Sequence, residues 1–388
     1  MARKDRPLGL APASVGDYRE FARRRLPRQL FDYIDGGANS EITMRRNIAD
    51  LAAVRLRQRV LRDVSNVNLA TKVLGCELEL PLILAPVGMA GMFARRAEVQ
   101  AVQAAGSRGI AFCESTVSIC GTEEVAAAAT GPLWFQLYVM RDRDYAADLM
   151  HSAAAVGCSA LVLTVDLSVV GARYRDGRNG LVDKIPATKQ FVRAWDLIGH
   201  PHWMSDVAIG GRPLTFGNLE RAVPGAHTPN DFKHWVDANF DPSVTWDDLE
   251  WVRANWPGKL ILKGILDPSD AVTAADRGAD AVIVSNHGGR QLDSTPSTIS
   301  MLPQVVDAVG DRLEVLVDGG IRGGIDVVKA LALGARACLV GRPWAWAVAS
   351  GGRDAVERMI DITAAEMRVA MSLTAVTDVA DLDRSILL

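Results

Sequence analysis

Short apolar runs rich in β-forming residues alternate with helical stretches along this 388-residue chain, starting near residue 80. The alternation is typical of βα units that build a parallel sheet, and near-continuous hydrophobicity indicates strands buried on both faces. There are eight such runs, the number of strands that closes a β/α barrel. We therefore predict an α/β fold, a TIM (β/α)8 barrel, with strands within residues 80–87, 110–115, 133–139, 160–166, 260–265, 281–287, 314–320 and 337–343.

Helical segments are expected on both sides of the barrel. Ser14 can cap a first helix that continues to about Leu26, and the stretch RQLFDYID forms a second that ends at two glycines. A third helix is expected at about residues 39–54, followed by short strands near 56–61 and 67–74. The chain is predicted to be one domain (1–388), in which residues 1–78 form an N-terminal helical segment, 79–350 the barrel and 351–388 a C-terminal helical segment.

The spacing of the strands is regular except after the fourth, where more than 90 residues precede the fifth. A capped amphipathic helix over residues 243–256 accounts for the last part. The rest, residues 171–242, is predicted to be a long loop that leaves from the C-terminal end of a strand, where the active sites of barrels lie. Loops of this length usually form a lid or a binding surface.

Charge and cysteine usage exclude several classes of protein. The formal net charge is −3 without a long block of one sign, which argues against nucleic-acid binding. The five cysteines are scattered and make no CxxC pair, which fits a reduced cytoplasm better than secretion. The N-terminus lacks the apolar core of a signal peptide, and the longest apolar run, residues 80–94, is too short to span a membrane.

Polar residues occur on or just after seven of the eight runs. Because the carboxyl ends of the strands meet at one rim of a barrel, these residues are expected to converge on one pocket. Any one of them could simply terminate a strand, whereas seven strand ends together favour an active site. The residues are Ser115, Gln136, Tyr138, Thr164, Asp166, Lys263, Ser285, His287, Arg290, Asp318, Gly319, Gly320, Arg322, Gly341 and Arg342.

The seventh and eighth runs end in the motifs DGGIRGG and VGRP. Glycines let the backbone approach an anion closely, and arginines supply charge-assisted hydrogen bonds. The loops after strands seven and eight are the usual phosphate site of this fold. Each motif is weak alone, but their position indicates a phosphate-binding site.

The sharpest local signal is SNHGGRQLD, which places His287 and Arg290 on a glycine-rich turn. A histidine near its neutral pKa can remove a proton, and an arginine can hold a carboxylate through two hydrogen bonds. The alternative is a capping histidine with a surface arginine. The HPH stretch at 200–202 has no accompanying carboxylate or cysteine cluster, so no metal site is predicted.

With these motifs in view, the sequence resembles the FMN-dependent α-hydroxy acid dehydrogenases along essentially its whole length. The motifs that carry the resemblance are FDYIDGGANSE, RLRQRVL, APVGM, WFQLYV, LTVD, GARYRD, KGILDP, SNHGGRQLD, DGGIRGG and GRP. Within the family, the likeness is greatest to the bacterial L-lactate dehydrogenase branch, through DGGANSEITMRRN, STVSIC, GARYRDGRNG, HPHW, NFDPSVTWDDLEW and KGILDP.

The resemblance implies roles for individual residues. His287 matches the catalytic base and Asp166 the carboxylate that pairs with it. The substrate contacts are matched by Tyr33, Tyr138, Arg173 and Arg290. The cofactor contacts are matched by Pro86, Val87, Gly88, Ser115, Gln136, Thr164, Lys263, Ser285, Asp318, Gly319, Gly320, Arg322, Gly341 and Arg342. One departure is Glu114, where the family usually has an apolar residue; strand alternation points it away from Ser115, toward the helix layer.

The implied activity is FMN-dependent oxidation of L-lactate to pyruvate, with electrons passed to a quinone or another respiratory acceptor. Alternatives are a dehydrogenase or oxidase of another L-2-hydroxy acid such as glycolate or mandelate, an FMN-barrel isomerase, and a non-catalytic flavin-binding protein. The two arginines with His287 argue against the isomerase, and the complete catalytic set argues against the non-catalytic protein. Gly88, where oxidases of the family often carry alanine, favours a dehydrogenase. A homo-oligomer is also expected.

Residues 184–210 of the long loop combine apolar and basic side chains: Phe191, Trp195, Leu197, Ile198, Trp203 and Met204 lie near Lys184, Lys189 and Arg193. Such a mixture suits a membrane interface. The resemblance favours this interpretation and implies a peripheral protein on the cytoplasmic face of the inner membrane. The alternative is a lid packed on the barrel mouth, or a contact between subunits.

Overall fold

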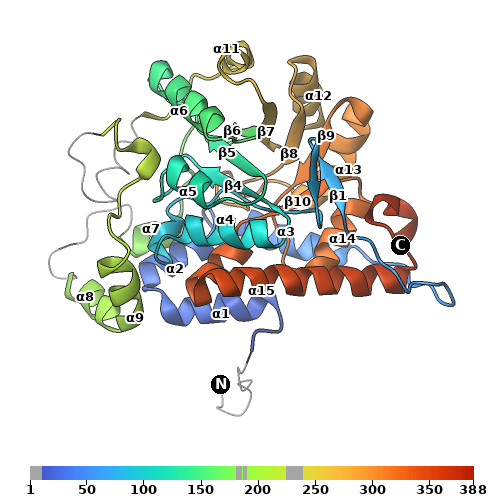
Figure 1. Cartoon of the computed structure of the whole chain (residues 1–388), viewed down its shortest axis with the longest axis horizontal. Coiled ribbons are helices and arrows are strands. Elements are labelled where there is room, and N and C mark those ends of the chain that lie inside the picture. The colour runs from blue at the N-terminus through green and yellow to red at the C-terminus, as the bar shows by residue number, and fades with distance from the viewer. Residues whose placement is uncertain (1–10, 181–185, 187–189, 224–238) are drawn as a thin grey trace.

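The computed structural model describes residues 11–180, 186, 190–223 and 239–388 (Figure 1). Its centre is a closed barrel of eight parallel strands, which confirms the fold predicted from the repeating runs. The last strand closes the barrel by pairing with the first. The barrel strands are β3 (Leu82–Leu84), β4 (Ala111–Ser115), β5 (Leu133–Leu137), β6 (Ala160–Thr164), β7 (Lys259–Ile265), β8 (Ala281–Val284), β9 (Glu314–Val317) and β10 (Ala337–Val340).

The barrel strands bury side chains on both faces. Cys113, Val162 and Ile261 belong to the cluster that fills the barrel interior, and all three are fully buried. Their neighbours, such as Phe112 and Leu161, belong to the larger core between the strands and the helices. Strands covered on both sides need apolar residues at nearly every position, so they could be recognised in the sequence.

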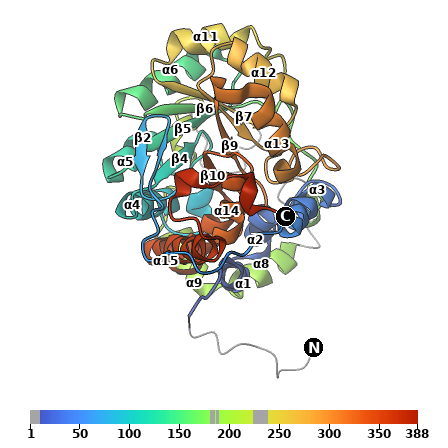
Figure 2. The same cartoon turned by 90° about the vertical axis from the view of Figure 1, so that its right-hand side faces the viewer.

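Helices surround the barrel (Figure 2). The longest, α15, is kinked at Gly351 and Gly352 and packs against α1, α4 and α14. The covering helices are α4 (Ala97–Ser107), α5 (Thr122–Ala128), α6 (Arg143–Ala155), α11 (Asp248–Asn255), α12 (Pro268–Asp276), α13 (Thr298–Val309), α14 (Gly324–Ala332) and α15 (Arg342–Thr374). Single 3-10 turns are η2 (Ala90–Met92), η6 (Gly310–Arg312), η7 (Val379–Asp381) and η8 (Arg384–Ile386).

The N-terminal segment forms the three expected helices, α1 (Val15–Arg25), α2 (Arg28–Asp35) and α3 (Ile42–Ala53). The prediction of a strand at 56–61 is wrong. Leu56 makes one isolated bridge with Leu387, and among the described residues no strand pairs with residues 57–61.

The strand predicted at 67–74 is reduced to β1 (Thr71–Val73), which pairs with an unpredicted antiparallel strand, β2 (Cys76–Leu78). Val73, Leu74 and Leu78 join the interior cluster beside the first residues of the barrel strands. The hairpin therefore plugs the end of the barrel opposite the strand carboxyl ends.

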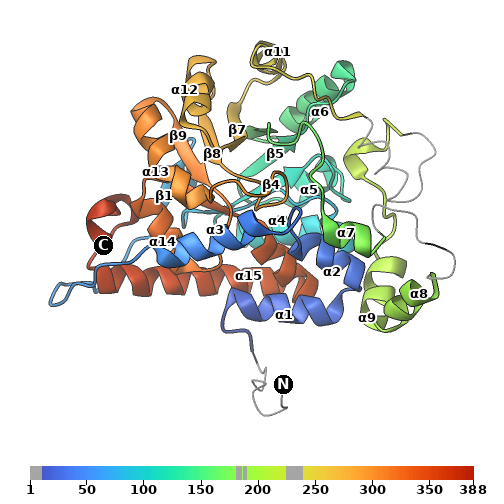
Figure 3. The same cartoon turned by 180° about the vertical axis from the view of Figure 1, so that it is seen from behind.

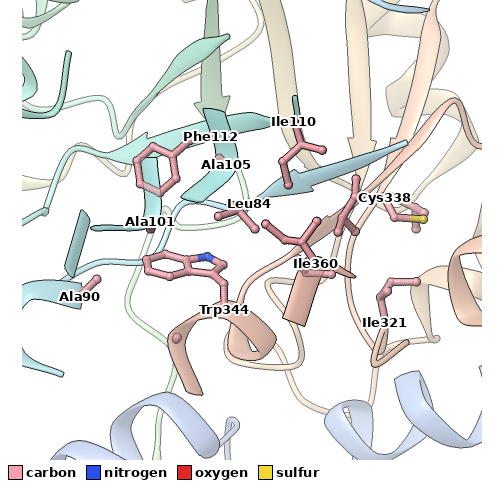
Figure 4. Packing of buried hydrophobic residues seen from close by; sticks show 14 of the residues in the cluster. Leu84, Ala90, Ala101, Ala105, Ile110, Phe112, Ile321, Cys338, Trp344 and Ile360 are labelled. Carbon is pink, nitrogen blue, oxygen red and sulfur yellow. The ribbon is translucent and has the colours of Figure 1, made fainter. Parts of the chain in front are cut away.

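Trp344, near the start of α15, fixes that helix to the barrel (Figure 4). Its buried indole meets Phe112 edge-on, with ring centroids 5.9 Å apart and an interplanar angle of 70°. The indole N–H donates to the carbonyl of Ala85 at 3.0 Å, just beyond β3. The chain that follows β3 and the helix that follows β10 are thus held together at the strand carboxyl ends.

The long loop after β6 contains short helical elements: α7 (Tyr174–Arg178), α8 (Gln190–Ile198), α9 (Pro201–Trp203), the π-helix η4 (Met204–Ile209) and the 3-10 turn η5 (Gly217–Leu219). Helices α8 and α9 project at one corner of the molecule, beyond α1 and α2 (Figure 3). The loop rejoins the barrel where Phe240 bridges Met140, and the predicted helix that follows is α11. Among the described residues, no helix has the length and apolar character needed to cross a membrane.

Gly324 generates a test of packing between α14 and α15. A Cβ at this position would lie 2.2 Å from the carbonyl oxygen of Thr363 and 2.4 Å from the amide of Met367, both backbone atoms of α15. We expect Gly324→Ala to lower the free energy of unfolding by about 1–3 kcal/mol, because one of the two helices must move. The control is Gly16→Ala, where a Cβ meets only Ser14 Oγ at 3.4 Å. Equal melting temperatures for the two variants would contradict this packing.

Candidate active site

A pocket of about 1120 Å³ lies at the carboxyl ends of the barrel strands. Its wall contains sixteen of the residues predicted from the sequence: Tyr33, Pro86, Val87, Gly88, Tyr138, Thr164, Arg173, Lys263, His287, Arg290, Asp318, Gly319, Gly320, Arg322, Gly341 and Arg342. The other four, Ser115, Gln136, Asp166 and Ser285, stand just behind the wall and hydrogen-bond to it or to one another. The strand-end pattern therefore identified residues that the fold brings together.

His287 is held by Asp166 across the pocket floor. The imidazole Nδ1 lies 2.9 Å from Asp166 Oδ1, and because a carboxylate accepts, this nitrogen carries the hydrogen and Nε2 keeps its lone pair. The backbone of His287 has a φ of +56°, a left-handed conformation that is costly for a residue other than glycine. The two features, a fixed ring and an unusual backbone, orient one basic nitrogen into the pocket.

Burial and charge set the protonation states of this pair in opposite ways. Burial lowers the pKa of His287, and Asp166 opposes that shift without outweighing it. Burial also opposes the charge on Asp166, but nearby His287 and Lys263 overcome it and lower the pKa of that carboxyl. At neutral pH the site therefore holds a neutral imidazole beside a carboxylate, which is the form that can accept a proton.

Two arginines face the pocket over one tyrosine ring. The guanidinium carbons of Arg290 and Arg173 lie 4.9 and 5.9 Å from the centroid of Tyr33. Burial and the neighbouring Arg173 charge lower the pKa of Arg290 to about 10. Arg290 also donates to the carbonyls of Tyr33 and Gly36, which fixes its position at the end of α2. Two like charges that are buried together are stabilised by an anion between them, such as a carboxylate.

Lys263, on β7, belongs to a chain of buried polar groups in the same pocket. Its Nζ is 3.0 Å from Asp318 Oδ2 and donates to Ser285 Oγ at 2.9 Å. Burial disfavours the ammonium, but Asp318 and Asp166 outweigh it and raise the pKa of Lys263. The pocket floor therefore keeps a permanent positive charge that can stabilise negative charge on a bound group.

Several polar atoms on this side of the pocket fit a flavin. Gln136 Nε2, Thr164 Oγ1 and Asp318 Oδ1 are buried and have no hydrogen-bond partner within the described part of the chain. They include donors and acceptors, as the edge of a flavin ring and its ribityl chain require. Gly319 and Gly320, both with φ of +91°, turn the backbone beside them, where only glycine is readily accommodated.

The predicted phosphate arginines have additional protein contacts. Arg342 donates to the carbonyls of Ile34, Gly36 and Gly288 at 3.0, 2.7 and 2.9 Å, while Arg322 lies 5.1 Å over the ring of Trp346. Burial, together with the charges of Arg290 and Arg322, lowers the pKa of Arg342. Buried cations that repel one another in this way fit a phosphate dianion, so the residues present fit FMN.

Two aromatic residues of the pocket wall, Phe216 and Phe240, were not found from the sequence. Both belong to the part of the long loop that returns to the barrel. The rings of Phe240 and Tyr138 lie 4.8 Å apart, and the backbone of Phe240 is fixed by its bridge to Met140. No local motif marks either residue, because their places depend on where the loop returns.

Comparisons with known proteins agree with this site. A model of the FMN-dependent dehydrogenase family matches residues 22–388. An L-lactate dehydrogenase of Caulobacter vibrioides (strain NA1000 / CB15N) is 54% identical over 97% of this chain and 97% of the relative. An L-lactate dehydrogenase of Pseudomonas syringae pv. syringae (strain B728a) is 50% identical over 97% of this chain and 98% of the relative.

Solved structures show the same fold. The monotopic membrane protein (S)-mandelate dehydrogenase has a TM-score of 0.91 at 34% identity, covering 97% of this chain and 99% of that one. A mandelate oxidase has a TM-score of 0.82 at 37% identity, covering 96% and 98%. A family model that spans nearly the whole chain, and relatives that are half identical to it, lead to one conclusion: this chain belongs to the FMN-dependent dehydrogenase family.

Proposed function

We propose that this protein oxidises L-lactate to pyruvate with FMN as cofactor. The observation that carries the proposal is the pairing of His287 with Asp166 in a pocket that is also lined by Arg173 and Arg290, a base next to a carboxylate-binding site. An L-2-hydroxy acid offers both groups, a carboxylate and a CH–OH carbon that is oxidised to a carbonyl with loss of two protons and two electrons; His287 accepts one of the protons, and the other leaves with the electrons to the flavin. The names of the relatives, L-lactate dehydrogenase, support lactate within this class.

The roles proposed for the side chains come from the family resemblance and agree with their positions in the pocket. Arg173 and Arg290 bind the substrate carboxylate, and the hydroxyls of Tyr33 and Tyr138 contact the substrate beside them. His287 takes a proton from the substrate at Nε2, and Asp166 stabilises the imidazolium that results.

The proposed cofactor contacts divide along the flavin. The ring edge would be held by Ser115, Gln136, Thr164, Lys263 and Ser285. Residues 86–88 would lie against the face of the ring. The glycines and arginines after β9 and β10 would hold the ribityl chain and the phosphate. FMN, when bound, accepts the two electrons that leave the substrate. The Lys263 ammonium would supply positive charge beside the flavin ring.

Turnover with a series of acids tests the substrate. With FMN bound and an artificial electron acceptor, we expect kcat/KM for L-lactate to exceed that for glycolate and for (S)-mandelate by at least about tenfold, since a fitted pocket distinguishes apolar groups by about 1–3 kcal/mol. Preference for mandelate, the compound in the names of the structural neighbours, would replace lactate by that alternative. If none of the three acids were oxidised, the proposal that the protein acts on a 2-hydroxy acid would be wrong.

His287→Ala tests the base. We expect kcat to fall by a factor on the order of 10²–10⁴ or more while FMN remains bound, because the variant loses the proton acceptor and none of the proposed flavin contacts. The wild-type kcat/KM should rise with pH through a pKa below 6.5, since burial lowers the pKa of His287 and only its neutral form accepts a proton. A variant with near-normal turnover, or an acid limb above pH 7, would exclude this role.

We also propose that α8 rests on a membrane surface and that electrons pass from the flavin to a respiratory acceptor such as a quinone. Helix α8 has no buried residue, and Phe191, Trp195 and Ile198 are 61%, 69% and 66% exposed, together with Ile209 at 69% in η4. Arg193 is exposed on the same helix. This arrangement fits peripheral contact from the cytoplasmic side, and one of the structural neighbours is a monotopic membrane protein.

Three residues expected in this surface face the protein instead: Trp203 is buried, and Leu197 and Met204 are partly buried against the core. Trp203 is only 7% exposed and donates to the carbonyl of Met92 at 2.8 Å. Lys184 and Lys189 lie outside the described residues.

The exposed pair Val369 and Leu373 on α15 is a separate apolar surface, which we propose faces a second copy in a homo-oligomer.

The membrane contact is tested by changing Phe191, Trp195 and Ile198 to serine together. We expect the variant to lose most of its co-sedimentation with anionic phospholipid vesicles and its quinone reduction, while lactate still reduces the bound FMN. Binding by the wild type should weaken with salt. The control changes Leu292 and Ile325, exposed apolar residues outside the loop, to serine. Unchanged vesicle binding by the triple variant would assign α8 to a protein contact.

A further inference from the structure

A group of buried polar side chains lies behind β4, on the side of the strand away from the barrel interior. Glu114 is fully buried there, and its contact with Asn218, outside the barrel, agrees with the direction expected from strand alternation. Glu98, from α4, is 1% exposed, and its Oε1 accepts from the backbone amides of Gly91 and Ile119 at 3.0 and 2.9 Å. Oε2 of each glutamate has no hydrogen-bond partner within the described residues. The proposed catalytic residues do not include this group.

Asn218 connects the group to the long loop. Its Nδ2 donates to Glu114 Oε1 and to the carbonyl of Ser115, both at 3.3 Å. Its Oδ1 accepts from the amide and the hydroxyl of Thr122 at 2.8 Å. One amide side chain thus ties the returning part of the loop to β4 and to the start of α5. Two residues earlier, Phe216 lines the substrate pocket.

The backbone around Asn218 is packed closely on the same region. Gly217 donates to the carbonyls of Ser118 and Ile119 at 3.2 and 3.3 Å, and a Cβ on Gly217 would meet the amide of Gly121 at 2.4 Å. The carbonyl of Asn218 accepts from the Tyr145 hydroxyl at 2.7 Å. This docking leaves little room for water beside Glu114, so the state of its carboxyl matters to the contact.

We propose that Glu114, in its protonated form, is a positioning residue that holds residues 216–219 against β4 and thereby keeps Phe216 in the wall of the substrate pocket. A neutral carboxyl can be buried against Asn218 at little cost. A carboxylate in the same place is buried without a cation and beside Glu98, and it is relieved when residues 216–219 separate from β4 and admit water.

The surroundings of Glu114 support this titration. Burial raises the pKa of Glu114 to about 8; the Asn218 amide opposes the shift, and Glu98 adds to it. The other groups that face this cluster are Cys120 after β4, Cys158 before β6 and Tyr145 on α6, and burial raises the pKa of each. The nearby cation, Arg96 at the start of α4, is paired with Glu124. Glu114 therefore changes charge at a lower pH than these thiols and the phenol.

The first test rests on the proposed function. The KM of the FMN-loaded wild type for L-lactate should rise about tenfold from pH 7 to pH 9, because a group of pKa about 8 keeps its proton in only about a tenth of the molecules at pH 9. The kcat should change less. In Glu114→Gln, which keeps an acceptor for Asn218 and cannot ionise, KM should stay flat over this range. The same alkaline rise in that variant would overturn the proposal.

Two comparison variants separate titration from loss of a contact. Thr122→Val removes the hydroxyl that donates to Asn218 and that also lowers the pKa of Glu114, but it removes no ionisable group, so KM should be higher at every pH while the alkaline rise remains and moves to a higher pH. Glu114→Leu should have a raised but pH-independent KM. If Thr122→Val lost the alkaline rise and Glu114→Leu kept it, the titrating group would not be Glu114.

The second test needs no substrate, so it is independent of whether lactate is the correct acid. In the FMN-loaded wild type, amides 216–219 should lose hydrogen-exchange protection above pH 8, relative to amides of β5, and should keep it in Glu114→Gln.

Because the folded-state pKa of Glu114 is above its usual value of 4.5, its stabilising effect is complete below pH 4.5 and is lost as the pH rises to about 8. The melting temperature of Glu114→Gln should therefore exceed that of the wild type by an amount that grows over this interval. Constant protection and a constant difference would overturn the proposal even if lactate proved to be the wrong substrate.

Discussion

The chemistry of this site depends on a row of buried ionised groups, Asp166, Lys263 and Asp318, that compensate one another's charge. A lone charge in a protein interior is costly, so it either finds a partner or gives up its charge. Here Lys263 lies between Asp318 and Asp166, and Asp166 in turn holds His287. The two carboxylates stabilise the ammonium. Burial, with a smaller contribution from the Lys263 charge, lowers the pKa of His287 against the opposing effect of Asp166, so the imidazole is left neutral. These contacts thus keep Lys263 positively charged and leave His287 neutral, so that it can accept a proton.

The barrel makes this row possible because each member comes from a different strand end. Asp166 follows β6, Lys263 is on β7, His287 follows β8 and Asp318 follows β9, and these strands are neighbours in the closed sheet. The order of the residues around the pocket is therefore their order in the sequence. For that reason the strand-end residues and their convergence could be predicted: a buried parallel strand is recognisable locally, and the position of its carboxyl end follows from the fold. The roles assigned to them came from the family resemblance.

The predictions failed where a structure depends on contacts between distant residues. The run at 56–61 makes one isolated bridge, from Leu56 to Leu387, and no ladder, and Val60 and Leu61 are 70% and 100% exposed. The sequence prediction gave one strand where the structure has the hairpin of β1 and β2. Both strands are short, and the hairpin is stabilised by the burial of Val73 in the barrel interior, which no local pattern indicates. Phe240 likewise reaches the pocket only because the loop returns beside Met140. These features carry no local signal.

Both limbs of the long loop are fastened to the barrel by buried polar contacts close to the site. In the outgoing limb, Arg175 binds Asp35 at 2.9 Å and Glu41 at 2.7 Å, two residues after Arg173 enters the pocket. In the returning limb, Asn218 binds β4 just after Phe216. The exposed helix α8 lies between these two attachments. Each attachment is made by polar contacts to buried groups, so the positions of Arg173 and Phe216 in the pocket wall depend on keeping Asp35, Glu41 and Asn218 paired rather than on apolar area alone.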